Sequence, residues 1–403
     1  MITTCLLCQQ APPATLEPGV FPITNFNQVA MQTQQQAMQA RLDALGVQRG
    51  KPEQTQPGTL YVADSYVPCI TSPEPAHGLE VQSAARSTGY QGPIQLRDFS
   101  SQHYVVYDPR DPQPGQDLRA SDYLRNLSWQ TQERFQQVLR PATQQLNELT
   151  EGGVKNSVLN ISMGTSLGRV VNEAYLQLVQ GTADRTGAAL AFGLDESKLT
   201  HPDPNISGPE RNRLQQALID EVGQTVKDSK SIHQAQEQYQ QAVSQFTAGQ
   251  NSLVVSGGNE GEVAHKLQDG SFGQQLKLPA NFLDSPLAQA GVVVVGATEG
   301  DHSLKPAAYS QAHRQNGIYA SGTVPGQPGE GSSFAAPRVA ATLAALHKAN
   351  PQLSSAEIQA LLLNHLTRPS EGSQIPALDL QATAQFLKES QLDNSQDGWL
   401  LSH

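Results

Sequence analysis

Ser333 lies at the start of a segment whose composition is typical of a buried helix. Residues 331–337 have the sequence GSSFAAP, and small or apolar residues follow as far as Leu346. A serine in the first turn of such a helix has its hydroxyl near the positive end of the helix dipole, beside backbone N–H groups that have no partner within the helix. This suits a nucleophile whose attack on a carbonyl group creates an oxyanion, and it equally suits a serine that only caps the helix. The motif alone does not choose between the two roles.

The strands that would position this serine are short and apolar. Residues 252–256 and 291–297 are runs without alternation, which is typical of parallel strands covered by helices on both faces. Earlier strand-like runs are residues 59–63, 94–96, 104–107 and 157–161. We therefore predict an α/β protein with a mostly parallel central sheet. Sheets of this kind place their sites at the carboxyl ends of the strands.

Helical patterns separate these runs. One begins at His77, one covers residues 115–150, and a large, mainly helical insertion covers 165–251. Within the insertion, Gly208-Pro209 predicts a helix start and residues 227–231 predict a break. Apolar residues with the spacing of one helix face follow the break: Ile232, Ala235, Tyr239, Ala242, Val243 and Phe246.

Three domain segments are predicted from composition and pattern. Residues 1–58, rich in Gln and Pro, form an N-terminal arm, 59–386 form the main domain that carries the insertion, and 387–403 form a tail. Near the end of the domain, Ser354 and Glu357 have the spacing of a capping box at the start of a helix.

Several segments, in the same chain order, resemble motifs of the subtilisin-like serine proteases. The 331–337 segment is similar to the family's Gly-Thr-Ser-Met-Ala-x-Pro, with Ser332 in place of threonine. Residues 256–261 (SGGNEG) resemble Ala-Gly-Asn-Glu-Gly, and residues 162–164 (SMG) resemble Ser-Leu-Gly. The strand 291–297 and the closing segment 377–382 are also similar to parts of the family. The resemblance spans residues 60–382 and implies a three-layer subtilisin-like fold.

The resemblance implies the roles of two residues directly. Ser333 stands at the position of the nucleophile, and Asn259 stands at the position of the side chain that stabilises the oxyanion. The remaining two positions match only in part. Asp64-Ser65 resembles the family's Asp-Ser-Gly, and His77-Gly78 resembles the start of its His-Gly-Thr-His.

The segment between Asp64 and His77 departs from the family pattern. Tyr66, Leu79 and Glu80 replace motif residues. The two candidates are 13 positions apart, which is short for this family and requires a tight loop. Its prolines, which would stiffen the loop, are Pro68, Pro73 and Pro75.

Other residues compete for these two roles. Asp108 also ends a strand-like run, but it follows His77, and the order Asp, His, Ser that marks subtilisins would then fail. His103 and His265 are not followed by glycine. We therefore assign Asp64 and His77.

These assignments imply the mechanism of a serine endopeptidase. His77 would act as general base for Ser333, Asp64 would orient the imidazole, and Asn259 together with the Ser333 backbone N–H would hold the oxyanion. An extended peptide or protein substrate would form main-chain hydrogen bonds along two short edges. Those edges consist of Ser162, Met163 and Gly164, and of Ser256, Gly257 and Gly258.

Two alternatives remain open. The partial matches at Asp64 and His77 would also fit a catalytically silent subtilisin-like module that binds peptides or proteins. A sedolisin-like carboxyl protease fits less well, because it would need neither His77-Gly78 nor an oxyanion asparagine. The insertion 165–251 could cover the cleft, bind a partner protein or only face solvent.

Composition excludes several classes of partner. The chain has 403 residues and a formal net charge of −11, which disfavours nucleic acid and anionic membranes. No apolar run approaches the length of a membrane-spanning helix. The region 1–19 has no Lys or Arg, unlike a secretory signal, which favours a cytoplasmic location or export without a standard signal.

The sequence does not predict a metal or another cofactor. Cys5 and Cys8 form a lone Cys-x-x-Cys without the second ligand pair of a zinc site. Calcium is common in the family that the chain resembles, but no cluster of carboxylates with suitable spacing is present.

Overall fold

The computed structural model describes most of the chain between residues 36 and 392. The described ranges are 36–52, 55–66, 76–99, 120–200, 208–270, 274–311, 316–324, 326–327 and 329–392. The predictions at Cys5, Cys8, His103, Asp108 and the strand 104–107 fall outside these residues.

A single eight-stranded sheet passes through the described part of the chain in the order β2-β1-β3-β4-β5-β6-β8-β7. All neighbouring strands are parallel except β7 and β8, which are antiparallel. The strands are β1 Leu60–Asp64, β2 Ile94–Asp98, β3 Val158–Ile161, β4 Ser252–Ser256, β5 Val292–Thr298, β6 Gly317–Ser321, β7 Thr367–Arg368 and β8 Ala377–Leu378. The predicted α/β class with a mostly parallel sheet is therefore confirmed.

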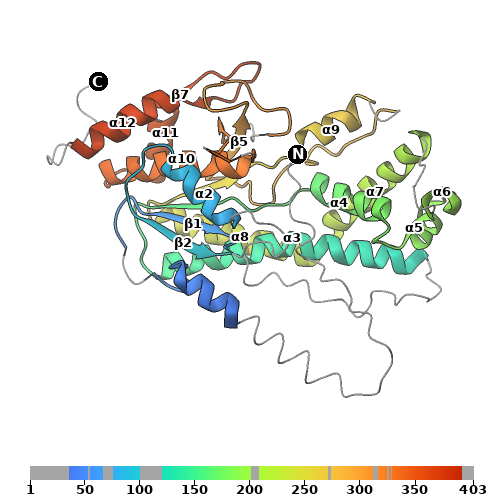
Figure 1. Cartoon of the computed structure of the whole chain (residues 1–403). Coiled ribbons are helices and arrows are strands. Elements are labelled where there is room, and N and C mark those ends of the chain that lie inside the picture. The colour runs from blue at the N-terminus through green and yellow to red at the C-terminus, as the bar shows by residue number, and fades with distance from the viewer. Residues whose placement is uncertain are drawn as a thin grey trace.

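Helices cover both faces of the sheet, which gives three layers (Figure 1). One face packs against α2 His77–Arg86, α10 Ser332–Ala349, α11 Ser355–His365 and α12 Leu380–Leu392. The other face packs against α3 Ala120–Glu151 and α8 Lys230–Ala248. Successive strand residues alternate between the two cores: Val62 lies in the first, and Tyr61 and Ala63 lie in the second. Both faces are apolar, which explains the absence of alternation in the strand sequences.

The insertion has a core of its own. It contains α4 Leu167–Gln180, α5 Arg185–Phe192, α6 Glu196–Thr200 and α7 Gly208–Asp228. Buried side chains of these helices pack against the first half of α3 and against α9 Gly261–Gln268. The predicted helix start at Gly208 and the predicted break are both confirmed, because α7 ends at Asp228 and the Ser229 side chain caps α8 by accepting from Ile232 N.

The last part of the predicted N-terminal arm packs against the main domain. Residues 36–44 are helical, and Leu42 and Val47 are buried in the core that contains α2 and α10. Gln48 pairs with Arg97 at the edge of β2, and Arg49 forms an ion pair with Asp98. We therefore propose that the folded unit begins before residue 59.

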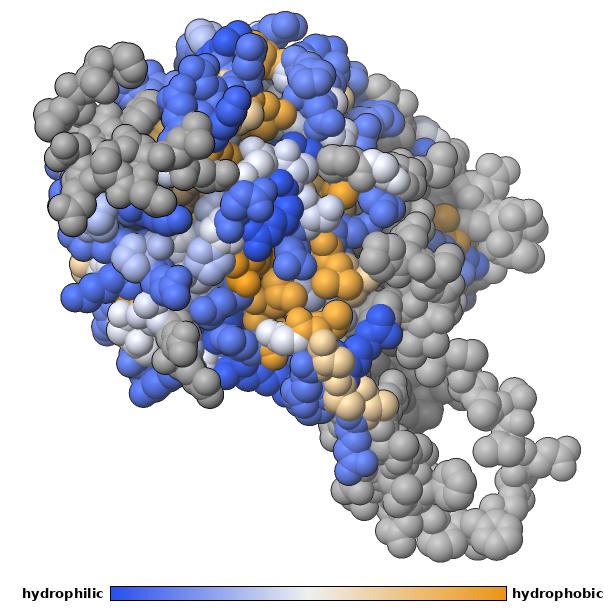
Figure 2. Space-filling view, turned by 60° about the vertical axis from the view of Figure 1, so that its left-hand side comes forward, coloured by the Kyte–Doolittle hydropathy of each residue, from blue (hydrophilic) through white to orange (hydrophobic). Residues whose placement is uncertain are grey.

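The face in Figure 2 is largely hydrophilic, with hydrophobic residues gathered near its middle. Within the described residues, no helix combines the length and the apolar composition that crossing a bilayer requires.

Candidate active site

The predicted site residues come from the carboxyl ends of three neighbouring strands and from the first turns of α2 and α10. Asp64 is the last residue of β1, Ser162 follows β3, and Asn259 follows β4. The three strands are adjacent and parallel, so their carboxyl ends lie at one edge of the sheet. The amino end of α10 brings Ser333 to the same edge, since Ser333 bonds to Ser162.

Asp64 and His77 form a short, partly buried hydrogen bond. His77 Nδ1 lies 2.7 Å from Asp64 Oδ1, and the Asp64 side chain is fully buried whereas that of His77 is 35% exposed. The same Oδ1 accepts a bond from Ser65 N at 2.6 Å. Because Nδ1 is occupied by the carboxylate, the exposed ring can present only Nε2 to another group.

The 13-residue spacing between the two residues is accommodated by close packing at the start of α2. Gly78 N donates to the carbonyl of Ser65, which fixes the first turn of α2 against the end of β1. A Cβ atom at Gly78 would lie 2.6 Å from the Tyr66 ring, so this position requires glycine. Tyr66 departs from the family motif, yet its buried ring is the surface on which the His77-Gly78 turn rests.

The charge of Asp64 determines the direction in which the pKa of His77 is shifted. Burial by itself would lower the pKa of His77, but the charge and hydrogen bond of Asp64, together with the charge of Glu80, outweigh burial and raise the pKa above 6.5. Arg169 opposes this rise. The imidazole also packs against the Phe334 ring, with ring centroids 5.5 Å apart, and so lies next to the residue that follows Ser333.

Ser333 is the accessible residue in the buried part of α10. From Ser332 to His347, every residue of α10 is buried except Ser333. Pro337 lacks an N–H group, so the Ser333 carbonyl has no donor in its own helix. Ser162 Oγ supplies that donor at 2.8 Å, and it accepts a bond from Asn160 Nδ2 at 3.0 Å. Sequence reasoning treated Ser162 only as a substrate-binding residue, although Pro337 was a signal that the carbonyl needed a partner.

The Ser333 hydroxyl bonds to Ser162 and not to His77 in this structure. Ser333 Oγ donates to the Ser162 carbonyl at 3.1 Å, and none of the hydrogen bonds among the described residues joins Ser333 to His77. Contacts between a catalytic serine and its base are often long without substrate.

Asn259 is held by its side-chain carbonyl. Asn259 Oδ1 accepts from Ser332 N at 2.9 Å, and among the described residues its amide nitrogen has no hydrogen-bond partner. The Ser332 hydroxyl accepts from Gly258 N at 3.1 Å. Gly258 has a φ of +108°, a conformation that favours glycine. Ser332, which replaces the family's threonine, therefore joins the loop after β4 to the helix that carries Ser333.

The predicted substrate-binding edges are partly occupied by the chain itself. Gly257 N donates to the Val295 carbonyl, and the Gly257 carbonyl accepts from the Gln311 side chain. The Gly164 carbonyl accepts from Arg169 Nη1 at 3.1 Å. The roles of Ser162–Gly164 and Ser256–Gly258 in binding a peptide stay predictions.

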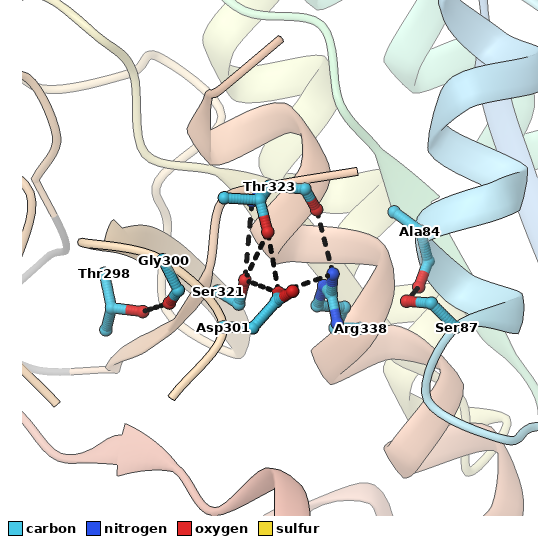
Figure 3. Close-up of polar contacts among 8 residues, drawn as sticks. All are labelled: Ala84, Ser87, Thr298, Gly300, Asp301, Ser321, Thr323 and Arg338. Atoms are coloured by element: carbon cyan, nitrogen blue, oxygen red, sulfur yellow. Dashed lines mark hydrogen bonds and ion pairs between the residues drawn. The ribbon is translucent and has the colours of Figure 1, made fainter. Parts of the chain in front are cut away.

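A polar network ties α10 to the loops that follow β5 and β6 (Figure 3). The guanidinium of Arg338 is buried and donates to Asp301 Oδ1 at 3.1 Å and to the Thr323 carbonyl at 2.8 Å. Asp301 also accepts from the hydroxyls of Ser321 and Thr323. Burial alone would raise the pKa of Asp301, but these hydroxyls and the charge of Arg338 lower it. The network fixes the loop that leads into the first turn of α10.

The competing histidine His265 lies away from the candidate site. His265 is on α9, where its exposed ring pairs with Asp269. No group of three or more His, Cys, Asp or Glu side chains within the described ranges is placed to hold a metal ion.

Comparison with known proteins identifies the family. The model of the subtilase family matches residues 134–396, which is more than half of the chain. The matched region contains Ser162, Asn259 and Ser333, whereas Asp64 and His77 precede it. A search of curated proteins finds no match.

Solved structures of proteases resemble the chain at low identity. A lanthipeptide protease is 13% identical, with a TM-score of 0.40, and the likeness covers 86% of this chain and 91% of that one. The nisin leader peptidase NisP from Lactococcus lactis is 15% identical, with a TM-score of 0.41 and coverage of 84% and 89%. Similarity at this level says nothing about the substrate of this chain. The fold described above and the family match agree, and the chain belongs to the subtilase family of serine proteases.

Proposed function

We propose that the chain is a serine endopeptidase in which Asp64, His77 and Ser333 form the catalytic triad and Asn259 donates to the oxyanion. The observation that carries this proposal is the 2.7 Å contact between Asp64 Oδ1 and His77 Nδ1, at the edge of the sheet where α10 presents Ser333. The contact joins the two residues whose motifs match the family least well. It supports the assignment independently of the family match, which does not reach them.

In the proposed reaction, Ser333 Oγ turns from the Ser162 carbonyl toward His77 Nε2 and attacks the carbonyl carbon of the scissile bond. The hydroxyl proton moves to Nε2, a C–O bond forms, and the substrate oxygen becomes the oxyanion. Nε2 then gives this proton to the leaving amine as the C–N bond breaks. Water then gives a proton to Nε2 and attacks the acyl carbon, the C–O bond to Ser333 breaks, and Nε2 returns the proton to Ser333 Oγ as the acid leaves.

The oxyanion would be held by two donors. One is the side-chain amide nitrogen of Asn259, whose amide oxygen is held by the bond from Ser332 N. The other is the backbone N–H of Ser333, in the first turn of α10, where it has no intrahelical acceptor. Loss of one such donor typically lowers turnover by about 10²–10³, a figure measured on a subtilisin.

One observation favours a second candidate, a silent module that binds peptides without cleaving them. The Ser333 hydroxyl is engaged by Ser162 and does not bond to His77. If that contact persisted with substrate bound, the serine would not be activated.

Hydrolysis of an unfolded protein substrate tests the proposal. The wild-type chain should release new peptide amino termini, and the Ser333→Ala and His77→Ala chains should not. His265→Ala is the matched control. His265 is exposed and also pairs with an aspartate, Asp269, but it lies on α9 and not on α2. Binding of the substrate without cleavage by the wild type would replace the proposal with the silent module.

A further inference from the structure

Arg169 lies beside the predicted substrate-binding edge. It is in the first turn of α4, where its backbone N–H donates to the Ser166 cap, and its Nη1 donates to the Gly164 carbonyl at 3.1 Å. Gly164 is two residues from Ser162, which bonds to Ser333. The guanidinium is therefore a short distance along the edge from the nucleophile. Its effect on the pKa of His77 agrees with this position.

The charge of Arg169 is only partly matched by its own neighbours. Its Nε donates to Glu173 Oε1 at 3.1 Å, but the other oxygen of Glu173 pairs with Arg134 at 3.2 Å. Glu173 thus divides its carboxylate between two guanidinium groups. In the described part of the chain, Arg169 Nη2 has no hydrogen-bond partner, and 37% of the side chain is exposed. A planar donor group is available to a carboxylate that enters from the cleft.

The spacing along the edge indicates where in a substrate that carboxylate would lie. An extended chain advances about 3.3 Å per residue. A peptide that lies along Ser162–Gly164 with its scissile bond at Ser333 therefore has its second or third residue from that bond opposite Gly164. A glutamate or aspartate side chain within two to four residues of the bond would reach Arg169.

We propose that Arg169 is a specificity-determining residue that selects peptides with an acidic side chain two to four residues from the scissile bond. The inference rests on the proposed function for the location of that bond. Arg169 now donates to the carbonyl that a peptide N–H would use. When a substrate carboxylate binds the guanidinium, it replaces the hydrogen bond from Arg169 to the Gly164 carbonyl. That carbonyl can then accept a hydrogen bond from a peptide N–H. An acidic peptide thus gains a main-chain hydrogen bond to the Gly164 carbonyl in addition to its ion pair with Arg169, and a neutral peptide gains neither.

The first experiment measures binding to the full-length Ser333→Ala chain. The probes are fluorescent positional-scanning peptides in which one position is fixed as Glu or as its neutral isostere Gln. We expect the Glu peptides to bind about tenfold more tightly at one position, as for a charge-assisted contact at a partly exposed site. In the Arg169→Gln chain this ratio should fall to near one, and Arg169→Lys should restore part of it.

Arg213→Gln is the matched control. Arg213 is also exposed and also donates to a backbone carbonyl, that of Gly193, but it lies on α7 in the insertion. This variant should keep the full preference for Glu. Equal binding of Glu and Gln peptides at every position, or a preference for Glu that survives in Arg169→Gln, would overturn the inference.

The design separates this inference from the proposed function. Binding to the Ser333→Ala chain does not require catalysis, so a silent module with an acidic subsite would still show the preference. Conversely, a wild-type chain that cleaves peptides without regard to acidic residues would leave the endopeptidase assignment intact and would reject the role of Arg169. In an active chain, the preference should appear in kcat/KM for Glu over Gln peptides.

Discussion

Ser162 and Ser333 exchange two hydrogen bonds. The Ser162 hydroxyl donates to the Ser333 carbonyl at 2.8 Å, and the Ser333 hydroxyl donates to the Ser162 carbonyl at 3.1 Å. The first bond completes a helix turn that Pro337 leaves without a donor, and the second directs the Ser333 hydroxyl to Ser162 and not to His77. The end of β3 therefore determines both the position of the first turn of α10 and the resting orientation of the hydroxyl.

Ser162→Ala should affect both stability and activity. The Ser333 carbonyl would lose its partner in a largely buried place, which we expect to lower the free energy of unfolding by about 1–2 kcal/mol. Peptide hydrolysis should fall by about tenfold, because the serine moves with its helix turn. Ser244→Ala is the control, since the Ser244 hydroxyl bonds only within α8 at an exposed position. A Ser162→Ala chain as stable and as active as the control would reject this role.

Asp64→Asn should abolish activity and leave the fold intact. An amide in place of the carboxylate would hold the wrong imidazole tautomer, with an expected loss of about 10⁴ in turnover. Asp98→Asn is the matched control, because Asp98 closes the neighbouring strand in register with Asp64 and pairs with Arg49. Measuring the rate of peptide hydrolysis of each variant shows whether activity depends on the Asp64 carboxylate and not on that of Asp98. Near wild-type activity of Asp64→Asn would contradict the triad.

The fold and the residues of the candidate site could be predicted from local patterns, and the roles of those residues stay predictions. The apolar runs located β1, β4 and β5, and the Ser354 and Glu357 spacing located the capping box at α11. Contacts between distant segments were not predictable. Arg338 meets Asp301 and Thr323 only after two strands and a helix are packed together. Arg169 reaches Gly164 because Ser166 caps α4 between them, and the sequence alone does not give that side-chain direction.

The pH dependence of hydrolysis should report the raised pKa of His77. The imidazole acts as a base only when it is neutral, so kcat/KM should rise with pH and reach half its plateau above pH 6.5. Glu80→Gln removes a charge that favours the protonated ring and should lower this midpoint. Glu262→Gln, at an exposed position on α9, should leave it unchanged. A midpoint below 6.5 in the wild type would contradict this account of the site.

His347 should make the fold sensitive to acid. Burial lowers the pKa of His347 to about 4, and its Nε2 lies 2.9 Å from Ser252 Oγ inside the core. The unfolded chain binds a proton near pH 6.5 and the folded chain does not, so stability is full above pH 6.5 and is lost as pH falls toward 4. Protonation of His347 should thus lower the free energy of unfolding by about 3 kcal/mol across this pH range.

Chemical denaturation at several pH values measures this effect. The free energy of unfolding of His347→Gln should vary less between pH 6.5 and pH 4 than that of the wild type. His265→Gln, which changes an exposed histidine, should follow the wild type. Identical pH dependence in all three chains would show that His347 does not titrate as described.

The most direct test of the central claim is labelling by a fluorophosphonate, which reacts with a serine that a neighbouring base activates. The wild-type chain should take up one label, and mass spectrometry of its peptides should place that label on Ser333. The Ser333→Ala chain should take up none, and the His77→Ala chain should label far more slowly because no base activates the hydroxyl. Equal labelling of the wild-type and Ser333→Ala chains, or no labelling of the wild type, would contradict the assignment of Ser333 as an activated nucleophile.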